Sequence, residues 1–391
     1  MKNNRTFLEK LLDGSEVEWK PLDEVANIAN NARKPVKSSL RISGNIPYYG
    51  ANNIQDYVEG YTHDGEFVLI AEDGSASLEN YSIQWAVGKF WANNHVHVVN
   101  GKEKLNNRFL YHYLTNMNFI PFLAGKERAK LTKAKLQQIP IPIPPLSVQT
   151  EIVKILDALT ALTSELTSEL TLRRKQYEYY REKLLSVDNL KLSTEHIQWV
   201  KLNDLGELIR GNGLQKKDFT ETGVPAIHYG QIYTYYGTFA TETKSFVSPE
   251  LAKKLKKAKY GDVLIAGTSE NVKDVMKPLG WFGSEIAFSG DMFAFRPNKK
   301  VNTKYLTYIL QTEKFYKFKE KYAQGTKVIR VRADNFLNYE IPLPPFEEQQ
   351  RIVSILDKFE ALTNSITEGL PLAIEQSQKR YEYYRELLLS F

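Results

Sequence analysis

The sequence contains no cysteine, and only 4 of its 391 residues are methionine. Without cysteine the chain can form neither a disulfide framework nor a thiolate metal site. It also has no apolar run approaching the roughly 20 residues needed to cross a bilayer, and its N-terminal segment lacks the long apolar stretch of a signal peptide. We therefore expect a cytoplasmic protein that makes no use of a membrane.

Signatures of bond chemistry are also missing. The stretch around Gly125 lacks the first glycine and the hydroxyl of a phosphate-binding loop, and no Asn/Asp-Pro-Pro-aromatic motif of an amino-methylating enzyme is present. Residues 18–20 and 242–244 fit only half of a nuclease carboxylate–lysine motif, which is common by chance. His95 and His97 lie two apart on an expected strand without a third metal ligand, so we interpret them as surface or base-contacting histidines. We expect no catalytic residue, no metal and no cofactor bound by this chain.

What is present is an ordinary globular composition, with 42% hydrophobic and 25% charged residues. The net charge of +6 is unevenly spread, since residues 187–345 carry 24 Lys and Arg against 17 Asp and Glu, whereas residues 346–391 carry 5 against 8. A moderate basic excess in one long segment suits a polyanionic partner. The length of 391 residues indicates two or three domains.

The strongest internal signal is a duplication. Three motifs recur in the same order: Ile-Pro-Ile-Pro-Pro-Leu at 141–146 as Ile-Pro-Leu-Pro-Pro-Phe at 341–346, Ile-Val-Lys-Ile-Leu-Asp at 152–157 as Ile-Val-Ser-Ile-Leu-Asp at 352–357, and Tyr-Glu-Tyr-Tyr-Arg-Glu at 177–182 and again at 381–386. Trp19 matches Trp199 more faintly. The order is therefore domain, helix, domain, helix, and we place the boundaries at 1–145, 146–187, 188–345 and 346–391.

Each proline-rich motif is followed by helical periodicity, because proline ends the preceding structure and the apolar residues then recur three and four apart, as in a coiled-coil seam. The predicted seam is Ile152, Ile155, Leu159, Leu162, Leu166 and Leu170 in the first helix, and Ile352, Ile355, Phe359, Leu362 and Ile366 in the second. We expect the second helix to break near Gly369 to Pro371. The first instead carries a Thr-Ser-Glu-Leu tandem over 163–170, a unit of about one helical turn.

The two globular segments are predicted to be mixed α/β. Strands are expected at 67–71, 96–99, 263–266 and 292–295, and helices at 104–117 and 303–321. The lysines at 253–257 are interpreted as a solvated helix face. The fold class is thus α+β, with two mixed domains alternating with two long helices that pair as an antiparallel coiled coil with pseudo-twofold symmetry.

Candidate binding residues lie on loops rich in glycine, basic and amide side chains. Lys and Arg neutralise phosphates, while Asn, Gln and Arg make bidentate contacts to base edges. The alternative is that each tyrosine is core and each lysine a solvated face; the basic loops opened by Gly125 and Gly325 at equivalent positions favour binding. The candidates are Arg33, Lys34, Lys37, Arg41, Tyr49, Asn52, Asn53, Lys126, Arg128 and Lys130 in the first domain, and Arg210, Lys216, Lys217, Tyr229, Gln231, Thr268, Ser269, Thr326, Lys327, Arg330 and Arg332 in the second.

The repeated motifs resemble the paired conserved regions of Type I restriction–modification specificity subunits. The resemblance rests on Ile-Pro-x-Pro-Pro, then Glu-Ile-Val at 151–153 or Arg-Ile-Val at 351–353, and finally Tyr-Glu-Tyr-Tyr-Arg-Glu, and it covers the whole chain. The break near Gly369 and the Thr-Ser-Glu-Leu tandem also resemble features of that family. The globular domains cannot be matched residue by residue, because in that family they differ with the DNA sequence read.

The resemblance implies a non-catalytic scaffold within a larger enzyme. Each target-recognition domain would read one half of a split, asymmetric site in double-stranded DNA, and the helices would hold the domains apart. Two methyltransferase (modification) subunits would bring S-adenosylmethionine and methylate adenines. Restriction subunits, the motor and nuclease, would bring ATP and Mg.

Two other functions fit the residues. The chain could be a self-sufficient DNA-binding regulator that uses the same scaffold without catalytic partners, or a coiled-coil adaptor whose globular domains bind protein. Steep weakening of DNA binding by salt separates a DNA reader from the adaptor. Sequence-specific DNA binding without any partner subunit favours the regulator, and encoding beside a methylase favours the specificity subunit.

Overall fold

The computed structural model describes residues 6–125, 129–365 except 194–196, and 367–391. The chain divides into two compact units, of which the first comprises Met1–Glu165 with Glu375–Phe391 and the second Leu166–Ile374. Each unit therefore contains one globular domain together with helical segments from both repeats. No helix within the described ranges is long and apolar enough to span a membrane.

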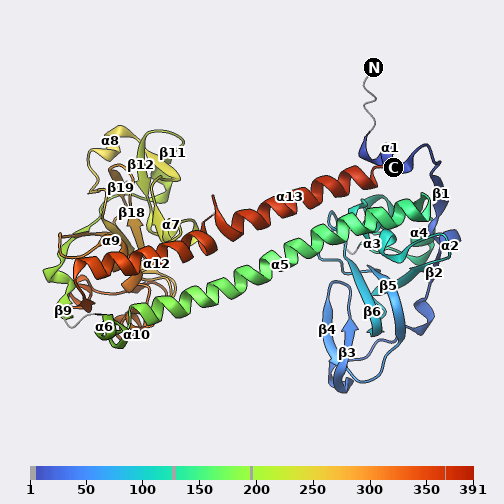
Figure 1. The fold of residues 1–391 in the computed structure, drawn as a ribbon, viewed down its shortest axis with the longest axis horizontal. Helices are drawn as coiled ribbons and strands as arrows, with labels where there is room; N and C mark the ends of the chain where they lie inside the picture. The colour runs from blue at the N-terminus through green and yellow to red at the C-terminus, as the bar shows by residue number, and fades with distance from the viewer. Residues whose placement is uncertain (1–5, 126–128, 194–196, 366) are drawn as a thin grey trace. The chain divides into compact units, whose positions relative to one another are not determined.

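The first unit is built on a six-stranded sheet (Figure 1). Its order is β2 (Ala26–Ile28), β7 (Val96–Gly101), β5 (His63–Ala71), β6 (Ile83–Ala92), β3 (Ser43–Tyr49) and β4 (Ile54–Val58), antiparallel except for the parallel β3–β6 pair. Residues 68–71 of β5 are completely buried. Because side chains alternate across a strand, Val68 and Ile70 pack with α3 (Asn107–Asn116), whereas Leu69 joins a separate cluster on the other face.

Helix α3 begins where the sequence supplies a cap. The Asn106 side-chain oxygen accepts hydrogen bonds from the amides of Arg108 and Phe109, which satisfies two otherwise unpaired donors. The remaining elements of this unit are short: α1 (Phe7–Leu12), β1 (Glu18–Pro21), α2 (Leu22–Val25), η1 (Asn30–Ala32), η2 (Ser38–Leu40), η3 (Ile120–Phe122), α4 (Lys133–Gln137) and β8 (Pro140–Ile143).

The second unit contains two five-stranded sheets. The first runs β10 (Gly206–Arg210), β20 (Met292–Pro297), β16 (Val263–Ala266), β18 (Pro278–Trp281) and β13 (Phe239–Ala240); the second runs β11 (Phe219–Thr220), β14 (Ser245–Val247), β12 (Val224–Ile227), β19 (Ile286–Phe288) and β15 (Lys257–Ala258). Strand β16 is fully buried, like residues 68–71 of β5, with Val263 and Ile265 in one apolar cluster and Leu264 in another. The central frame thus recurs, and the second sheet contains a parallel pair, β12–β19, as the first unit does in β3–β6.

Short elements complete the second unit: α6 (Val187–Ser193), β9 (Gln198–Lys201), η4 (Leu202–Asp204), η5 (Lys216–Asp218), α7 (Tyr229–Thr234), α8 (Pro249–Ala252), β17 (Thr268–Ser269), α9 (Thr303–Ile309), α10 (Glu313–Tyr322), β21 (Ile329–Arg330), α11 (Ala333–Leu337) and β22 (Glu340–Leu343).

Two helix predictions in this unit were wrong. The single helix expected over 303–321 is two helices, because the Thr312 hydroxyl accepts from the amide of Phe315 and caps α10 as a new start. The lysines at 253–257 do not form a helix face. Helix α8 ends at Ala252, and the chain then turns so that Lys257 pairs with β19 in strand β15.

The long helices follow the proline-rich strands. Helix α5 (Leu146–Leu184) has 39 residues, which at ~1.5 Å per residue gives a length of about 58 Å. The second repeat is two helices, α12 (Phe346–Asn364) and α13 (Gly369–Leu389). Gly369 has φ +76°, and a Cβ there would lie 2.4 Å from the Ala361 carbonyl oxygen, so this turn requires glycine.

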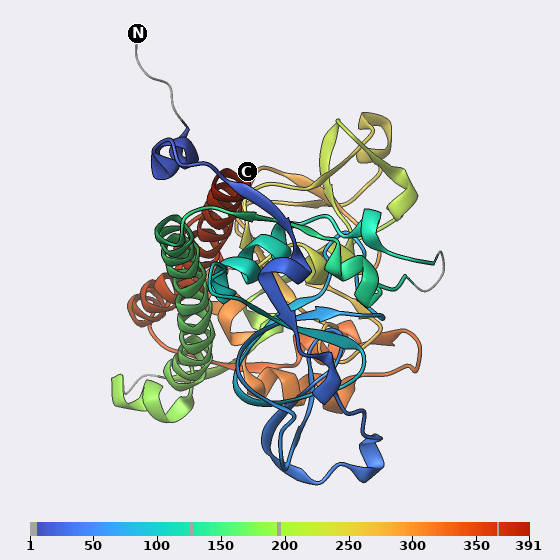
Figure 2. The ribbon, with the colours of Figure 1, turned by 90° about the vertical axis from the view of Figure 1, so that its right-hand side faces the viewer.

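Within the first unit, the beginning of α5 lies beside the end of α13 (Figures 1 and 2). Ile152 and Leu156 share an apolar cluster with Leu388, and the Thr163 and Ser377 hydroxyl oxygens are 2.8 Å apart. Lower numbers on α5 thus meet higher numbers on α13, which makes the contact antiparallel.

Within the second unit, the end of α5 meets α12. The rings of Tyr177 and Tyr180 stack on Phe359 at centroid distances of 6.2 and 5.5 Å. Arg174 donates a 3.3 Å hydrogen bond to the carbonyl of Thr363. This contact is antiparallel as well, because Arg174 meets a later residue of α12 than Tyr180 does.

The buried stripe differs from the predicted seam by one residue at several positions. Leu156 is fully buried where Ile155 was predicted, and Thr163 is half-buried beside the 39%-exposed Leu162. On α12 the fully buried residues include Leu356 and Thr363 next to the half-buried Ile355 and Leu362. The hydroxyls of Thr163 and Thr363 bond to the carbonyls of Leu159 and Phe359, which satisfies them and lets threonine occupy an apolar seam. Ile366 lies outside the described residues.

A buried glutamine at the start of each long helix fastens that helix to its domain; we call this contact the glutamine clasp. The Gln149 side chain accepts from the amide of Asn106 (2.8 Å) and donates to the carbonyls of Lys104 (2.9 Å) and Pro144 (2.8 Å). Gln349 does the same with the amide of Asn302 (2.8 Å) and the carbonyls of Lys300 (3.1 Å) and Pro344 (3.0 Å). The two glutamines are 0% and 1% exposed.

An aspartate two turns further along each helix makes a second attachment, the aspartate anchor. Asp157 accepts from Arg108 and from His112 Nε2, both at 2.8 Å. Asp357 accepts from Lys304 at 2.6 Å and from the hydroxyl of Tyr308 at 2.7 Å. The donors lie on α3 and α9, the helices that pack against the central strands, so each domain is attached to its long helix at two points.

The clasp predicts a specific instability. The Gln349→Ala variant leaves one amide and two carbonyls of the second unit without their buried partner, so we expect a loss of about 1–3 kcal/mol in the free energy of unfolding. Urea unfolding of the full chain measures this loss. Gln350→Ala, at the neighbouring exposed position, is the matched control and should be neutral. Equal stability of the two variants would contradict a structural role for the clasp.

Candidate nucleic-acid interface

Two loops meet at the same place in each unit. In the first, Lys130 forms isolated bridges with Ala124 and with Asp73, which follows β5. In the second, Arg330 bridges Gln324 and pairs with Thr268, which follows β16. Lys130 and Arg330, which follow Gly125 and Gly325, therefore lie beside the ends of the central strands. In the second unit this brings together Thr268, Ser269 and Arg330, predicted from separate parts of the sequence.

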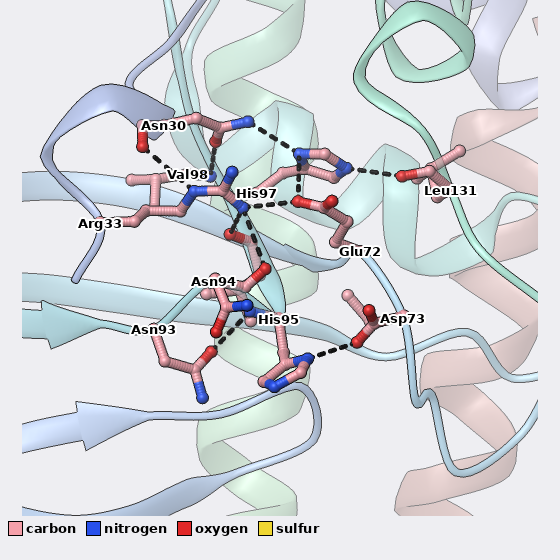
Figure 3. A network of polar contacts seen from close by, with 12 residues as sticks. Asn30, Arg33, Glu72, Asp73, Asn93, Asn94, His95, His97, Val98 and Leu131 are labelled. Atoms are coloured by element: carbon pink, nitrogen blue, oxygen red, sulfur yellow. Dashed lines mark hydrogen bonds and ion pairs between the residues drawn. The ribbon is translucent and has the colours of Figure 1, made fainter. Parts of the chain in front are cut away.

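In the first unit, a polar network centred on Glu72 lies at the end of the central strand β5 (Figure 3). Arg33 donates to Glu72 at 2.6 Å and to the carbonyl of Val96 at 2.8 Å, and the Lys130 ammonium lies 2.9 Å from Glu72. Burial alone would raise the pKa of Glu72, but the hydrogen bonds from Arg33 and Lys130 hold it below its usual value. Arg33 and Lys130 are thus engaged by a carboxylate within the domain.

His97 lies beneath this network and corrects one prediction. It is 0% exposed, its Nε2 donates to the carbonyl of Leu131 at 2.7 Å, and its Nδ1 accepts from the Asn30 amide at 2.9 Å. The Asn30 side-chain oxygen in turn accepts from the amide of Val98. Burial lowers the pKa of His97, so it is a neutral core residue. The interpretation of His97 as a surface or base-contacting histidine was wrong, because the strand turns it inward.

His95 points the other way. Its side chain is 49% exposed, and its Nδ1 is hydrogen-bonded to Asp73 (Figure 3). Among the described residues, no group of three or more His, Asp or Glu side chains has the arrangement of a metal site.

Some of the other candidate side chains of the first unit are held by contacts within the domain, and others are exposed to solvent. The Arg41 guanidinium lies 4.0 Å above the ring of Tyr48 and donates to the carbonyl of Val36. Asn52 closes a turn, donating to the carbonyl of Gly74 and accepting from the amide of Ala76, while Tyr49 is half-buried. The remaining candidates, Lys34, Lys37 and Asn53, are exposed. Lys126 and Arg128 lie outside the described residues.

The second unit has an open cleft of about 590 Å³ where the first has its network. Arg210, Arg330 and Arg332 line this cleft together with Asp291 and Asp334. All three arginines are exposed. Within the part of the chain that the structure describes, the Arg210 and Arg332 side chains have no hydrogen bond or ion pair, and Arg330 only approaches Asp291, at 4.0 Å. The cleft is therefore lined by cationic groups that the domain itself leaves unpaired or loosely paired.

The remaining candidates of the second unit are distributed around this frame. Lys216 and Lys217 are exposed on η5, and Thr326 and Lys327 are exposed on the loop opened by Gly325. Gln231 is structural, since it accepts from the amide of His228 and donates to the hydroxyl of Ser245. Of the other candidates in this unit, Tyr229 is half-buried, and Thr268 and Ser269 are 5% and 4% exposed.

The sequence reasoning missed the residues that position the interface. Gln149 and Gln349 form the clasps, and Asp157 and Asp357 form the anchors. A signal for them was present, because each pair recurs at the offset of 200 shared by the flanking motifs. Polar residues repeated inside an otherwise apolar helix pattern indicate a shared buried contact.

The described geometry agrees with known proteins. A family model for the Type I restriction modification DNA specificity domain matches residues 14–172 and 195–376. The chain belongs to this family, which confirms the resemblance found in the repeated motifs.

Its relatives are specificity subunits. The chain is 64% identical to a putative type I restriction enzyme specificity subunit of Haemophilus influenzae, with all of both chains covered. It is 32% identical to the EcoR124I/EcoR124II specificity subunit of Escherichia coli, with 99% of this chain and 97% of the relative covered.

Solved structures share the fold. The S subunit of a type I system from M. genitalium superimposes with a TM-score of 0.59 at 15% identity, covering 100% of this chain and 96% of the other. A chain from a solved type I restriction–modification system gives 0.53 at 17% identity, covering 96% of this chain and 98% of the other. The expected fold class, two mixed α/β domains with long helices, is confirmed.

Buried histidines make the first unit sensitive to acid. Burial lowers the pKa values of His63, His97 and His112 in the first unit, whereas His228 is the described histidine with a lowered pKa in the second. The unfolded chain takes up protons near pH 6.5 and the folded unit resists them, so stability falls as the pH drops below about 6.5.

We therefore expect hydrogen exchange of the full chain, corrected for intrinsic rates, to show a larger loss of protection in β5 to β7 than in β16 to β20 between pH 7.5 and 5.5. The second unit serves as the internal control. Increased protection of β5 to β7 at pH 5.5 would refute the assignment of the buried histidines as neutral groups that destabilise the first unit in acid.

Proposed function

We propose that this chain is the non-catalytic specificity subunit of a Type I restriction–modification complex, acting on DNA in the cytoplasm. Each globular domain reads one half of a split, asymmetric site in double-stranded DNA. The observation that carries this proposal is the contrast between frame and loops. The clasps are repeated contact for contact and the anchors recur at equivalent positions, while the meeting loops carry a carboxylate network in one unit and an arginine-lined cleft in the other.

Direct readout of bases needs such variable loops on a constant frame. Exposed lysines such as Lys34, Lys37, Lys216 and Lys217 neutralise phosphates and place the domain on the duplex, whereas side chains at the loop junctions contact base edges. Thr268, Ser269, Arg33 and Gln231 act by holding these loops in shape, because the structure buries or pairs their side chains.

Repeated exposed apolar residues support two copies of one partner. Trp19 and Trp199 are 49% and 45% exposed, and Leu146 and Phe346 are 48% and 43% exposed. These pairs occupy equivalent places beside the proline-rich strands. Exposed apolar side chains retained in both halves mark a surface for association. We assign this surface to two methyltransferase subunits that supply S-adenosylmethionine; restriction subunits supply ATP and Mg.

The helices set the distance between the half-sites. The antiparallel contacts of α5 with α13 and with α12 support a continuous antiparallel coiled coil between the readers. Placing the polar residues Thr163 and Thr363 in the helix contact costs little stability, because both hydroxyls are hydrogen-bonded within their own helices.

Exchanging one reader tests the division of labour. A chimaera in which residues 1–145 come from another specificity subunit should, with modification subunits, methylate sites changed in one half only. Sequencing of methylated adenines in genomic DNA measures this, and exchange of residues 188–345 is the reciprocal control. Changes in both half-sites from one exchange would contradict the proposal, and loss of all DNA dependence would favour the adaptor function.

Deleting residues 167–170 tests the spacer. The deletion removes one Thr-Ser-Glu-Leu unit, about 6 Å of helix, which corresponds to one to two base pairs at ~3.4 Å each. We expect the methylated half-sites to keep their sequences and to lie one or two base pairs closer. Replacing residues 167–170 by four alanines keeps the length and should leave the gap unchanged. An unchanged gap in an active deletion variant would show that the helix does not set the distance.

A further inference from the structure

The two units differ most at the junction beside the central strand. In the first unit, Glu72 and Asp73 follow β5; Glu72 holds Lys130 and Asp73 holds His95. In the second, the residues that follow β16 are Gly267 and Thr268, neither of which carries a charge. The junction has thus lost both of its carboxylates.

Without these carboxylates, the cation that corresponds to Lys130 is not held in a close ion pair. Arg330 takes the place of Lys130, since each bridges the residue six positions before it and pairs with the loop after the central strand. Asp291 takes the place of His95, since each immediately precedes the strand next to the central one, β20 or β7. Arg330 and Asp291 are 4.0 Å apart with side chains 62% and 47% exposed. They stand side by side at the cleft without closing a tight ion pair.

The mixture of charges argues against a phosphate ligand. Asp291 and Asp334 line the same cleft as Arg210, Arg330 and Arg332, and two carboxylates repel a phosphate. The major-groove edge of a G·C pair instead offers two acceptors on guanine, O6 and N7, next to the amino donor of cytosine. An arginine beside an aspartate presents the complementary set, a forked donor and an acceptor.

We infer that Arg330 and Asp291 form a reader for a G·C base pair in the half-site of the second domain. Arg330 donates to guanine O6 and N7, and Asp291 accepts from the cytosine amino group. Arg210 and Arg332 flank the pair and draw the duplex toward the cleft. In the first domain, Glu72 engages the equivalent cation, Lys130, and Asp73 is hydrogen-bonded to His95, so this position gives that half-site no guanine contact. The inference rests on the proposed function.

The test uses 7-deazaguanine, which lacks the N7 acceptor. Once the methylated site is known, binding of the full chain with its modification subunits is measured on duplexes in which each guanine of the second half-site is replaced singly. One replacement should weaken binding by roughly tenfold. The Arg330→Ala variant should bind the unmodified site about 10- to 100-fold more weakly. Its affinity should no longer depend on that 7-deazaguanine replacement.

Two further variants separate a base contact from a phosphate contact. Arg330→Lys keeps the charge but loses the planar fork, so it should bind the site more weakly than the wild type. Asp291→Asn should relax the preference for cytosine at the paired position. Arg380→Ala removes an exposed arginine on α13 and is the control, expected to bind normally.

Wild-type binding by Arg330→Lys, or an equal weakening of all duplexes by Arg330→Ala, would overturn the inference in favour of a phosphate contact. A second half-site without a G·C pair would overturn it as well. In both cases the proposed function survives, because it fails only if the chain selects no split site.

Discussion

The fold depends on a buried glutamine in each half that satisfies three main-chain groups at once. A buried amide or carbonyl without a partner costs about 1–3 kcal/mol, so the strand end, the loop before the domain helix and the first turn of the long helix can meet in only one arrangement. Gln149 and Gln349 create this arrangement twice. The aspartate anchors attach each domain to its long helix at a second point, which restricts rotation of the domain about the glutamine clasp.

A frame defined so tightly frees the loops to change. Residues 72–73 and 267–268 occupy the same place after a buried strand, yet one pair is acidic and the other uncharged. Neither pair is needed for the clasp or the anchor. Reading specificity can therefore vary while the geometry of the domain on its helix stays constant, which is what a family of specificity subunits requires.

The sequence predicted the features that follow from repetition and periodicity. The duplicated motifs indicated the order of domains and helices, and apolar runs identified β5 and β16. The seam was displaced at Leu162 because a simple apolar pattern favours leucine over Thr163, whose hydroxyl is satisfied within its own helix. The start of α10 was missed because one threonine cap outweighed a continuous pattern.

The site was harder to predict than the fold. A lone histidine such as His97 carries no sign of which strand face it occupies. The pairing of Arg33 with Glu72 joins residues 39 positions apart, and no local pattern records it. Composition predicts basic residues on loops, whereas Arg210 and Arg330 lie in strands β10 and β21. Only the tertiary structure separates cations held by a carboxylate from those left available to a ligand.

We propose that readers clasped to their helices require one distance between the two half-sites. Binding to a series of duplexes that carry both half-sites, with the gap lengthened or shortened one base pair at a time, measures this most directly. We expect a sharp affinity maximum at a single gap and a steep loss one or two base pairs to either side. Equal affinity across the series would contradict it.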